Sequence, residues 1–293
     1  MRRAFGSWSW VWMLCGAFHL YAADLVHGLW VWKSQAVLEA PHSANSLLKF
    51  CQSEGINEVY VSVAEDPLTF AISGERQMGR LIALLHASNI RVEALFSSAD
   101  ADEPGKHRDR LVSRVESVVR FNRQHARERF DGIHLDVEPH QRPENKGAGN
   151  LKFLPDLATT FRAVRAVAEP AGMTVNADIP KKYLKGGIGE RRMLLSSVPR
   201  LTLMLYEVSS PGDGESDLQK AEKLRNAGQE FLEMAYRGLG DAGLARIAIA
   251  LRTPDYGDSL RAMFQTLDQT FHGNRHYLGW ARHSYNDILA PSR

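Results

Sequence analysis

Short runs of β-branched and apolar residues alternate along the chain with longer segments in which apolar residues recur every three or four positions. The first pattern predicts strands and the second predicts amphipathic helices. The predicted strands are residues 28–33, 57–63, 90–96, 132–138, 173–179, 201–207, 246–252 and 276–282. Helices are predicted between them, among others at residues 75–87, 110–126, 157–168 and 218–236. This alternation is typical of an α/β fold.

Eight β/α units within about 250 residues match a single closed (β/α)8 TIM barrel, with the helices outside the strands. An open, doubly wound sheet is the competing architecture, but it favours a glycine-rich phosphate-binding turn after the first strand. Here Trp30-Val31-Trp32-Lys33 continues that strand without a glycine. No Pro/Gly/Ser-rich linker interrupts residues 24–293, so we expect one barrel domain over that range.

The N-terminus departs from this pattern. Arg2 and Arg3 precede an uncharged stretch at residues 8–20, and Tyr21-Ala22-Ala23 offers small residues for cleavage. These features predict a signal peptide at residues 1–23 and a secreted or periplasmic protein. The stretch is shorter than the roughly 20 residues that span a bilayer, so no integral membrane span is expected after cleavage. An uncleaved anchor is the alternative.

The composition is that of a globular protein, with 44% hydrophobic and 24% charged residues among 293. Loss of the leader removes two of 36 basic residues and none of the 34 acidic ones, which leaves a formally neutral chain. A basic surface patch that would bind nucleic acid or an anionic membrane is therefore not expected. Cys51 is the one cysteine outside the leader, so the mature chain has no pair for an internal disulfide. We expect a monomer that needs no cofactor.

The alternation of side chains along a strand indicates which residues face the barrel axis. In the fourth strand Ile133, Leu135 and Val137 must face the helices. The residues left to face the axis are His134, Asp136 and Glu138. Inward candidates on the other strands are Tyr60, Ser62, Glu93, Asn176, Asp178, Met204, Tyr206, Arg252 and Trp280. Active sites of this fold lie at the C-terminal strand ends. The residues expected to converge there are Glu138, Asp178, Tyr206, Glu207, Arg252 and Trp280.

The run DGIHLDVE at residues 131–138 resembles the fourth-strand signature D-G-x-D-x-D-x-E of the family-18 chitinase-like glycoside hydrolases, which ends in the catalytic acid. His134 replaces the middle aspartate. The run MLYE at residues 204–207 is similar to the sixth-strand M-x-Y-D/N pattern, with a longer acid. Trp280 stands where the eighth strand of that family supplies a sugar-stacking tryptophan. The third strand ends in SSAD at residues 97–100, where the family has S-x-G-G.

This resemblance implies an exported glycoside hydrolase that cleaves a poly- or oligosaccharide. A glycosidic oxygen leaves only when it is protonated, so one carboxyl group must stay neutral until the transition state. Glu138 is the expected general acid, and Asp136, on the same strand face, is its partner. In a substrate-assisted reaction on an N-acetylated sugar, the acetamido oxygen attacks the anomeric carbon, and Asp136 and Tyr206 orient it. Without an acetamido group, Glu207 or Asp178 would serve as nucleophile or base.

The remaining candidates are expected to bind the carbohydrate substrate: Trp32, Asp178, Tyr206, Glu207, Arg252 and Trp280. Trp32 and Trp280 come from strands that are neighbours in a closed barrel, and their indole rings are the expected sugar platforms. His134 lies deeper, where a hydrogen-bonded core histidine is the simpler interpretation. The charged residues 108–110 are interpreted as an exposed helix face.

Two other functions fit parts of the pattern. His134, Asp136, Glu138 and His140 recur at every second residue, and His27 opens the first strand, as a metal-dependent phosphodiesterase would require. Alternate side chains on a straight strand lie roughly 6 to 7 Å apart, however, so few could share one ion, and no metal site is predicted. The second alternative is a carbohydrate-binding barrel without turnover, against which the retained Glu138 argues.

Overall fold

The protein is described by a computed structural model that covers residues 25–39, 42–147, 151–208, 214–240 and 243–289. Its centre is a closed barrel of eight parallel strands, each hydrogen-bonded to the next, with β8 paired to β1. The strands are β1 (Val26–Val31), β2 (Glu58–Ser62), β3 (Arg91–Ser98), β4 (Gly132–Val137), β5 (Thr174–Pro180), β6 (Arg200–Met204), β7 (Arg246–Arg252) and β8 (Tyr277–His283). The predicted (β/α)8 barrel and its eight strands are confirmed. The predicted signal peptide lies outside the described residues.

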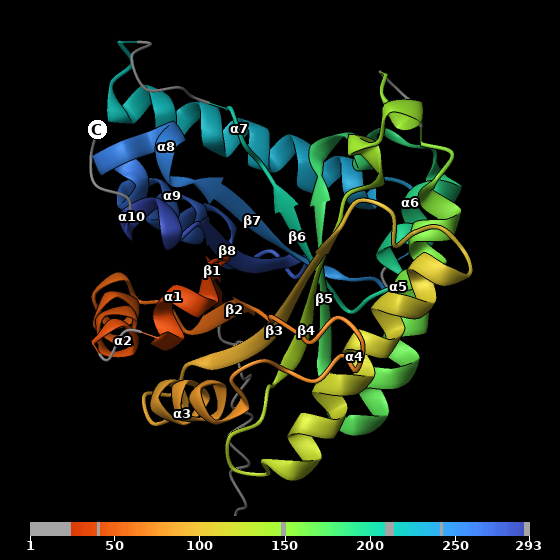
Figure 1. Cartoon of the computed structure of the whole chain (residues 1–293). Helices are drawn as coiled ribbons and strands as arrows, with labels where there is room; N and C mark the ends of the chain where they lie inside the picture. Colours follow the sequence, from red (N-terminus) through yellow and green to blue (C-terminus); the bar gives the residue numbers. More distant parts are fainter. Residues whose placement is uncertain (1–24, 40–41, 148–150, 209–213, 241–242, 290–293) are drawn as a thin grey trace, which may run out of the picture.

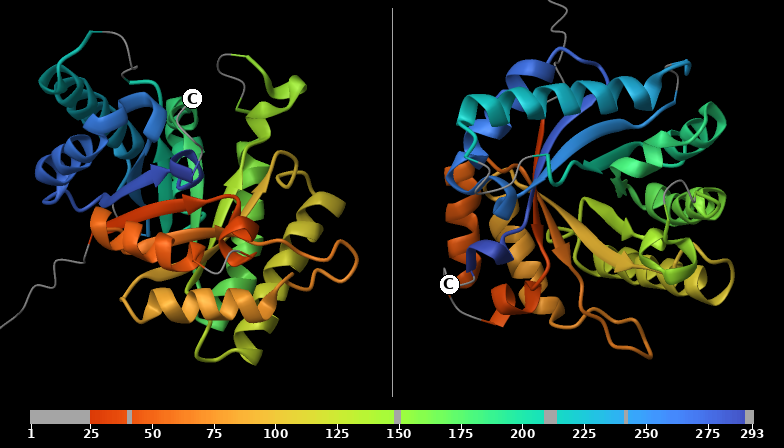
Figure 2. Two further views of the ribbon diagram at one scale, coloured as in Figure 1. Left: turned by 60° about the vertical axis from the view of Figure 1, so that its left-hand side comes forward. Right: turned by 90° about the horizontal axis from the view of Figure 1, so that it is seen from above.

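Helices surround the strands on the outside of the barrel (Figures 1 and 2). The α-helices are α1 (Ser34–Glu39), α2 (Ser43–Glu54), α3 (Glu75–His86), α4 (Lys106–Gln124), α5 (Leu154–Ala168), α6 (Ile188–Leu195), α7 (Asp217–Tyr236), α8 (Thr253–Tyr256), α9 (Leu260–Phe271) and α10 (Asn286–Leu289). The 3-10 helices are η1 (Pro139–Gln141), η2 (Pro143–Asn145), η3 (Glu169–Ala171), η4 (Lys181–Lys185) and η5 (Gly257–Ser259). None of the described helices is both long and apolar enough to cross a bilayer.

The apolar core has two parts that the strand alternation separates. The larger part lies between strands and helices and includes the aliphatic face of β4, with Ile133, Leu135 and Val137 fully buried. The smaller part fills the barrel interior and consists of Trp30, Tyr60, Leu95, Ala250 and Ala281. The predicted orientation of β4 is therefore correct, because the aliphatic side chains gain most by facing the helices.

Strand β8 contains one residue more than its neighbour β7 in the pairing between them. The pairing passes from Tyr277 to Gly279, so Leu278 is the extra residue. Gly279 permits this bulge because its φ is +138°, and a Cβ at this position would lie 2.0 Å from the Val26 carbonyl oxygen. The extra residue reverses the side-chain alternation in the remainder of β8.

Trp280 consequently faces the helices. Its ring stacks on Phe264 of α9 with 4.0 Å between centroids, and its Nε1 donates a hydrogen bond to Asp268 at 3.0 Å. The prediction that places Trp280 at the C-terminal end of the barrel as a sugar platform is therefore wrong. Ala281 and His283 turn inward instead, and His283 lies 5.7 Å from the Trp30 ring between centroids.

The N-terminal half of the barrel interior holds charged side chains. Arg200 donates hydrogen bonds to Glu58 and to Glu93, the latter at 3.1 Å, and Arg91 donates to Glu58 at 3.2 Å. Both glutamates are buried, and a buried charge costs several kcal/mol unless it is paired. Gly132 leaves room for this network, since a Cβ there would lie 2.8 Å from Glu93 Oε1.

Loss of Arg200 should destabilise the fold, because two buried glutamates would lose their main partner. We expect Arg200→Met to lower the free energy of unfolding by about 3 to 5 kcal/mol, measured by urea denaturation. The matched control is Arg162→Met on α5, an exposed arginine whose one hydrogen-bond acceptor among the described residues is Thr159. It should change stability by no more than about 0.5 kcal/mol. Equal losses in the two variants would contradict a structural role for the buried network.

Candidate active site

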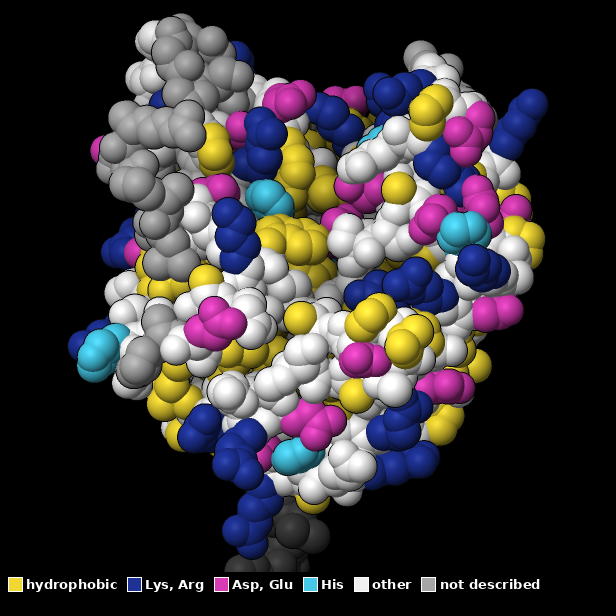
Figure 3. All heavy atoms as spheres, in the orientation of Figure 1, with side chains coloured by type: hydrophobic (Ala, Val, Ile, Leu, Met, Phe, Trp, Pro, Cys, Tyr) yellow, Lys and Arg dark blue, Asp and Glu magenta, His cyan; other side chains and the backbone are white. Residues whose placement is uncertain are grey.

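The candidate site lies at the C-terminal end of the barrel, which we call the barrel mouth. In the view of Figure 1, β5 and β6 run upward. The space-filling view in the same orientation shows a hollow in the upper part of the surface, which acidic, basic and hydrophobic side chains border (Figure 3). A group of side chains meets there through hydrogen bonds, ring contacts or the effect of one charge on the pKa of another. Its members are Trp32, Asp136, Glu138, Asp178, Tyr206, Arg252 and His283.

Glu138 is held at the end of β4 by its own backbone, whose N–H donates a hydrogen bond to the Ser98 carbonyl oxygen at 2.8 Å. Its side chain is 18% exposed. Burial and the negative charge of Asp178 raise the pKa of Glu138 to about 7, although Lys182 and a hydrogen bond from Gln141 act in the opposite direction. A carboxyl group with this pKa is partly protonated at neutral pH and can donate its proton to a leaving group.

Asp136 precedes Glu138 on the same face of β4 and is buried. Burial, followed by the negative charges of Asp178 and Glu138, raises the pKa of Asp136 well above its usual range, while the charge of His134 and, to a smaller extent, the Ser97 side chain oppose this shift. Oδ1 of Asp136 has no hydrogen-bond partner among the described residues. Since the three carboxyl groups repel one another, the site retains a proton at a pH where isolated carboxyl groups would be ionised.

Asp178 is fixed by a histidine inside the barrel. His134 Nε2 lies 2.8 Å from Asp178 Oδ1, and His134 Nδ1 lies 3.2 Å from Glu93 Oε2. Trp30 Nε1 donates to the other Asp178 oxygen at 3.2 Å, and the His134 ring stacks on Tyr60 at 3.7 Å. Burial disfavours the charged imidazole, but the two carboxylates outweigh it and raise the pKa of His134 to about 9. His134 is thus the hydrogen-bonded core histidine that the sequence favoured, and it is positively charged at neutral pH.

Tyr206 lies two residues beyond the end of β6 and is half-buried. Burial and the negative charges of Asp178 and Asp136 raise the pKa of Tyr206 well above its ordinary value. Its hydroxyl therefore keeps its proton and can donate a hydrogen bond. The guanidinium carbon of Arg252 lies 5.4 Å from the centre of the Tyr206 ring, so β6 and β7 contribute jointly to this side of the mouth.

Glu207 takes a more peripheral position than its neighbour. Its backbone has φ of +63°, its N–H donates to Asp255 Oδ2 at 3.0 Å, and its side chain is 70% exposed. The Glu207 carboxylate lies 3.7 Å from Arg252. The buried acid beside Arg252 is Asp255, which accepts a hydrogen bond from it at 2.6 Å and which the sequence analysis missed. The available signal was its place three residues after the end of β7, within the first turn of α8.

Trp32 and His283 form an aromatic wall beside Tyr206. Trp32 Nε1 donates to His283 Nε2 at 3.0 Å, and the His283 and Tyr206 ring centroids are 5.7 Å apart. Burial lowers the pKa of His283, so its ring is neutral and its proton lies on Nδ1. That atom has no hydrogen-bond partner among the described residues. Sequence reasoning missed His283 because it did not detect the bulge, for which Gly279 within a strand was the signal.

The histidines that suggested a metal site have other partners. His134 contacts Glu93 and Asp178, as described above. His27 lies at the opposite end of the barrel with Nε2 3.0 Å from Asp268. His140 Nδ1 lies 2.9 Å from the Tyr183 hydroxyl, and its Nε2 lies 3.7 Å from Glu138 Oε1. Within the described ranges, no three His, Cys, Asp or Glu side chains are grouped so as to hold a metal ion. The phosphodiesterase alternative therefore lacks a shared ligand set in this part of the chain.

No family model and no curated protein matches the sequence. Solved structures do match over most of the chain. The glycoside hydrolase domain of PgaB (BpsB) from Bordetella bronchiseptica has a TM-score of 0.55 at 11% identity, covering 91% of this chain and 96% of that one. The spore cortex-lytic enzyme SleL from Bacillus cereus has a TM-score of 0.58 at 9% identity, with coverages of 89% and 71%. A chitinase from Bacteroides thetaiotaomicron has a TM-score of 0.53 at 12% identity, with coverages of 90% and 92%.

This chain has the fold of the chitinase-like glycoside hydrolases. The resemblance predicted from β4 and from the segment at the end of β6 is thus confirmed at the level of the fold. At such low identities the shared feature is the glycosidase-like barrel, and the chemistry must be argued from its own side chains.

His134 should make the stability of this glycosidase-like barrel depend on pH. Its pKa of about 9 lies above the ordinary value of 6.5, so its contribution is complete below about pH 6.5 and is lost as the pH rises through 9. Over that interval the free energy of unfolding of the wild type should fall by up to about 3 kcal/mol more than that of His134→Gln. Urea denaturation at a series of pH values measures this difference. Parallel curves for the two proteins would contradict a charged His134.

Proposed function

We propose that this protein is an exported glycoside hydrolase that cleaves a poly- or oligosaccharide, with Glu138 as general acid and Asp136 as its partner. The observation that carries the proposal is a carboxyl group at the barrel mouth whose pKa is about 7, beside a second carboxyl group that is buried. The fold supports it, because structures with this fold are named as a chitinase and a glycoside hydrolase domain. Export rests on the predicted leader.

In the proposed reaction, Glu138 donates its proton to the glycosidic oxygen as the bond between that oxygen and the anomeric carbon breaks. The acetamido oxygen of an N-acetylated substrate forms a new bond to the same carbon and gives a cyclic intermediate. Water then attacks the anomeric carbon, Glu138 takes a proton from that water, and the ring reopens. Each turnover thus restores the protonated Glu138.

The contacts of the other acids favour this substrate-assisted course over a protein nucleophile. Asp178 already accepts hydrogen bonds from His134 and from Trp30, and the Glu207 side chain is largely exposed. Asp136, whose Oδ1 is unpartnered among the described residues, is the acid left to orient and stabilise the acetamido group. The remaining side chains around the acid pair are proposed to bind the flanking sugars: Trp32, Asp178, Tyr206, Glu207, Arg252 and His283.

Glu138→Gln tests the general acid, because the amide keeps the shape of the side chain and cannot supply the proton. We expect turnover of a susceptible oligosaccharide to fall by about 10² to 10⁴, with binding measured by calorimetry close to wild type. The control Glu233→Gln, at an exposed position on α7, should change neither quantity. Near wild-type turnover would remove Glu138 from the mechanism. Glycan binding without any turnover in the wild type would favour the carbohydrate-binding alternative.

A thiazoline analogue of the cyclic intermediate tests the substrate-assisted course. The enzyme should hydrolyse only glycans with an N-acetyl group on the cleaved sugar, and the analogue should inhibit it. Asp136→Asn should weaken both hydrolysis and inhibition, whereas Glu207→Gln should slow hydrolysis only moderately. Inhibition constants and rates for the three proteins are the measurements. Hydrolysis of a glycan without acetamido groups, together with indifference to the analogue, would exclude this course.

A further inference from the structure

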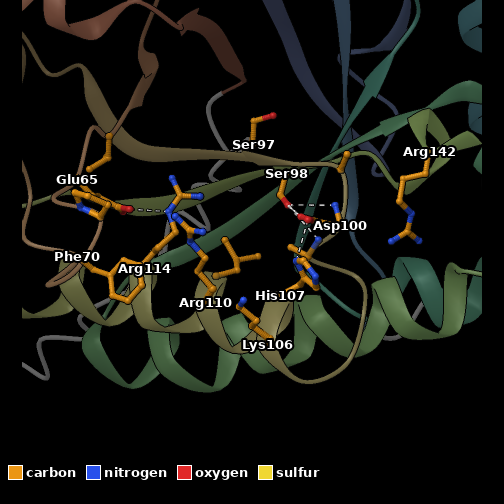
Figure 4. Close-up of a pocket in the computed structure, with 15 residues that line it drawn as sticks. Glu65, Phe70, Ser97, Ser98, Asp100, Lys106, His107, Arg110, Arg114 and Arg142 are labelled. Carbon is orange, nitrogen blue, oxygen red and sulfur yellow. Dashed lines mark hydrogen bonds and ion pairs between the residues drawn. The ribbon is translucent and has the colours of Figure 1, made fainter.

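A cavity lies on the outside of the barrel, near its C-terminal end. It lies between the end of β3 and the first half of α4, with further walls from the segments that follow β2 and β4, and its volume is about 750 Å³ (Figure 4). We call it the α4 pocket. The lining side chains that could contact a ligand include Phe70, Ser98, Lys106, Arg110, Arg114 and Arg142.

Three basic residues of this pocket share one face of α4. Lys106, Arg110 and Arg114 are spaced four residues apart, and Figure 4 shows all three on the helix below the end of β3. Arg114 is paired with Glu65 at 2.7 Å. Lys106 and Arg110 are exposed, and neither forms a salt bridge with a described residue. Because like charges at this spacing slightly destabilise a helix, an anion bound between them would be favourable.

The other charges at the edge of the pocket have partners. His107 Nδ1 lies 2.8 Å from Asp100, and Arg142 pairs with Asp102 at 2.9 Å. These contacts hold the loops around the pocket together. Lys106 and Arg110 are therefore the lining cations without a salt bridge to a described residue, although the charge of Arg110 also acts on Glu65.

An aromatic ring and a hydroxyl group complete the lining. The guanidinium carbon of Arg110 lies 6.0 Å from the centre of the Phe70 ring, which lines the pocket. The Ser98 hydroxyl group points from β3 toward α4 (Figure 4). Apolar ring faces, hydroxyl groups and cations are together the groups that recognise a sugar ring with an acidic substituent.

The α4 pocket lies on the outer side of the end of β3, the strand that pairs with the strand of the acid pair. Ser97 borders the pocket and stands opposite Asp136 in this pairing, but its hydroxyl group points away from α4 (Figure 4). Its neighbour Ser98, another lining residue, accepts the backbone hydrogen bond of Glu138. Arg142 lies four residues after Glu138 and lines the far side of the pocket. The end of β3 therefore separates Glu138 from the α4 pocket, and a glycan cleaved at Glu138 would reach the pocket by crossing this strand end.

We propose that the α4 pocket binds an acidic sugar, and that the substrate is consequently a glycan with carboxylate-bearing residues. This inference rests on the proposed glycosidase function and names the substrate class for it. Arg110 supplies a planar fork of donors that matches a carboxylate, and Lys106 supplies a second positive charge. The net neutrality of the predicted mature chain does not conflict with this, because the charge is local to one pocket.

The test compares two hexasaccharides that both contain N-acetylglucosamine. Hyaluronan hexasaccharide alternates it with glucuronate, whereas chitohexaose is neutral. At low salt, calorimetry on the full chain should show about tenfold tighter binding of the hyaluronan hexasaccharide. The double variant Lys106→Gln/Arg110→Gln should lose this preference. The matched control Arg120→Gln/Arg123→Gln removes the same charge from exposed positions nearer the other end of α4 and should keep it.

Equal affinity of the wild type for the two hexasaccharides, or a preference that survives the Lys106→Gln/Arg110→Gln change, would overturn the inference. The two proposals can fail separately. Glu138-dependent hydrolysis of chitohexaose without any acidic preference would keep the glycosidase and remove the role of the α4 pocket. An acidic preference that requires Lys106 and Arg110, in a protein that hydrolyses neither hexasaccharide, would keep the binding site and remove the enzyme.

Discussion

The ion pair between His134 and Asp178 is the interaction on which the candidate site depends. It ends a series of alternating charges that starts in the N-terminal half of the barrel. The series is Glu58, Arg200, Glu93, His134 and Asp178. Each inner member lies between charges of opposite sign, so the cost of removing it from water is offset by its neighbours. The barrel tolerates this polar interior because its main apolar core lies between the strands and the helices.

At the barrel mouth the charges no longer alternate in sign. Asp136 and Glu138 add two carboxyl groups beside Asp178, and His134 is already engaged on the inner side. The excess of partly buried carboxyl groups retains a proton near neutral pH, which is the property a general acid requires. A histidine where the resembled signature has an aspartate thus preserves the acid pair. The His134 cation lies beneath the pair and binds the carboxylate of Asp178 on β5.

The sequence predicted the strands and the inward face of β4 because an alternation of period two can be recognised without any tertiary information. Trp280 was misplaced because Leu278 inserts one residue and reverses that alternation. Glu207 was expected among the other acids, but a left-handed backbone and a largely exposed side chain leave it at the rim. Arg110 was interpreted only as part of an exposed helix face. That pattern does not show which faces border a pocket, because the opposite wall comes from distant segments of the chain.

The barrel mouth is acidic and the α4 pocket has basic residues. The electrostatic forces that these charges exert on a ligand act over a short range. The Debye length is about 8 Å at physiological ionic strength, so exposed Lys106 and Arg110 affect a ligand in the α4 pocket far more than one approaching from a distance. Each such contact contributes only about 1 kcal/mol or less to affinity. An acidic sugar bound one position out of register, however, would lose that attraction and also meet the repulsion of Asp136 and Glu138. In the proposed glycosidase, the main consequence of the α4 pocket would therefore be to select which bond of the glycan lies at Glu138.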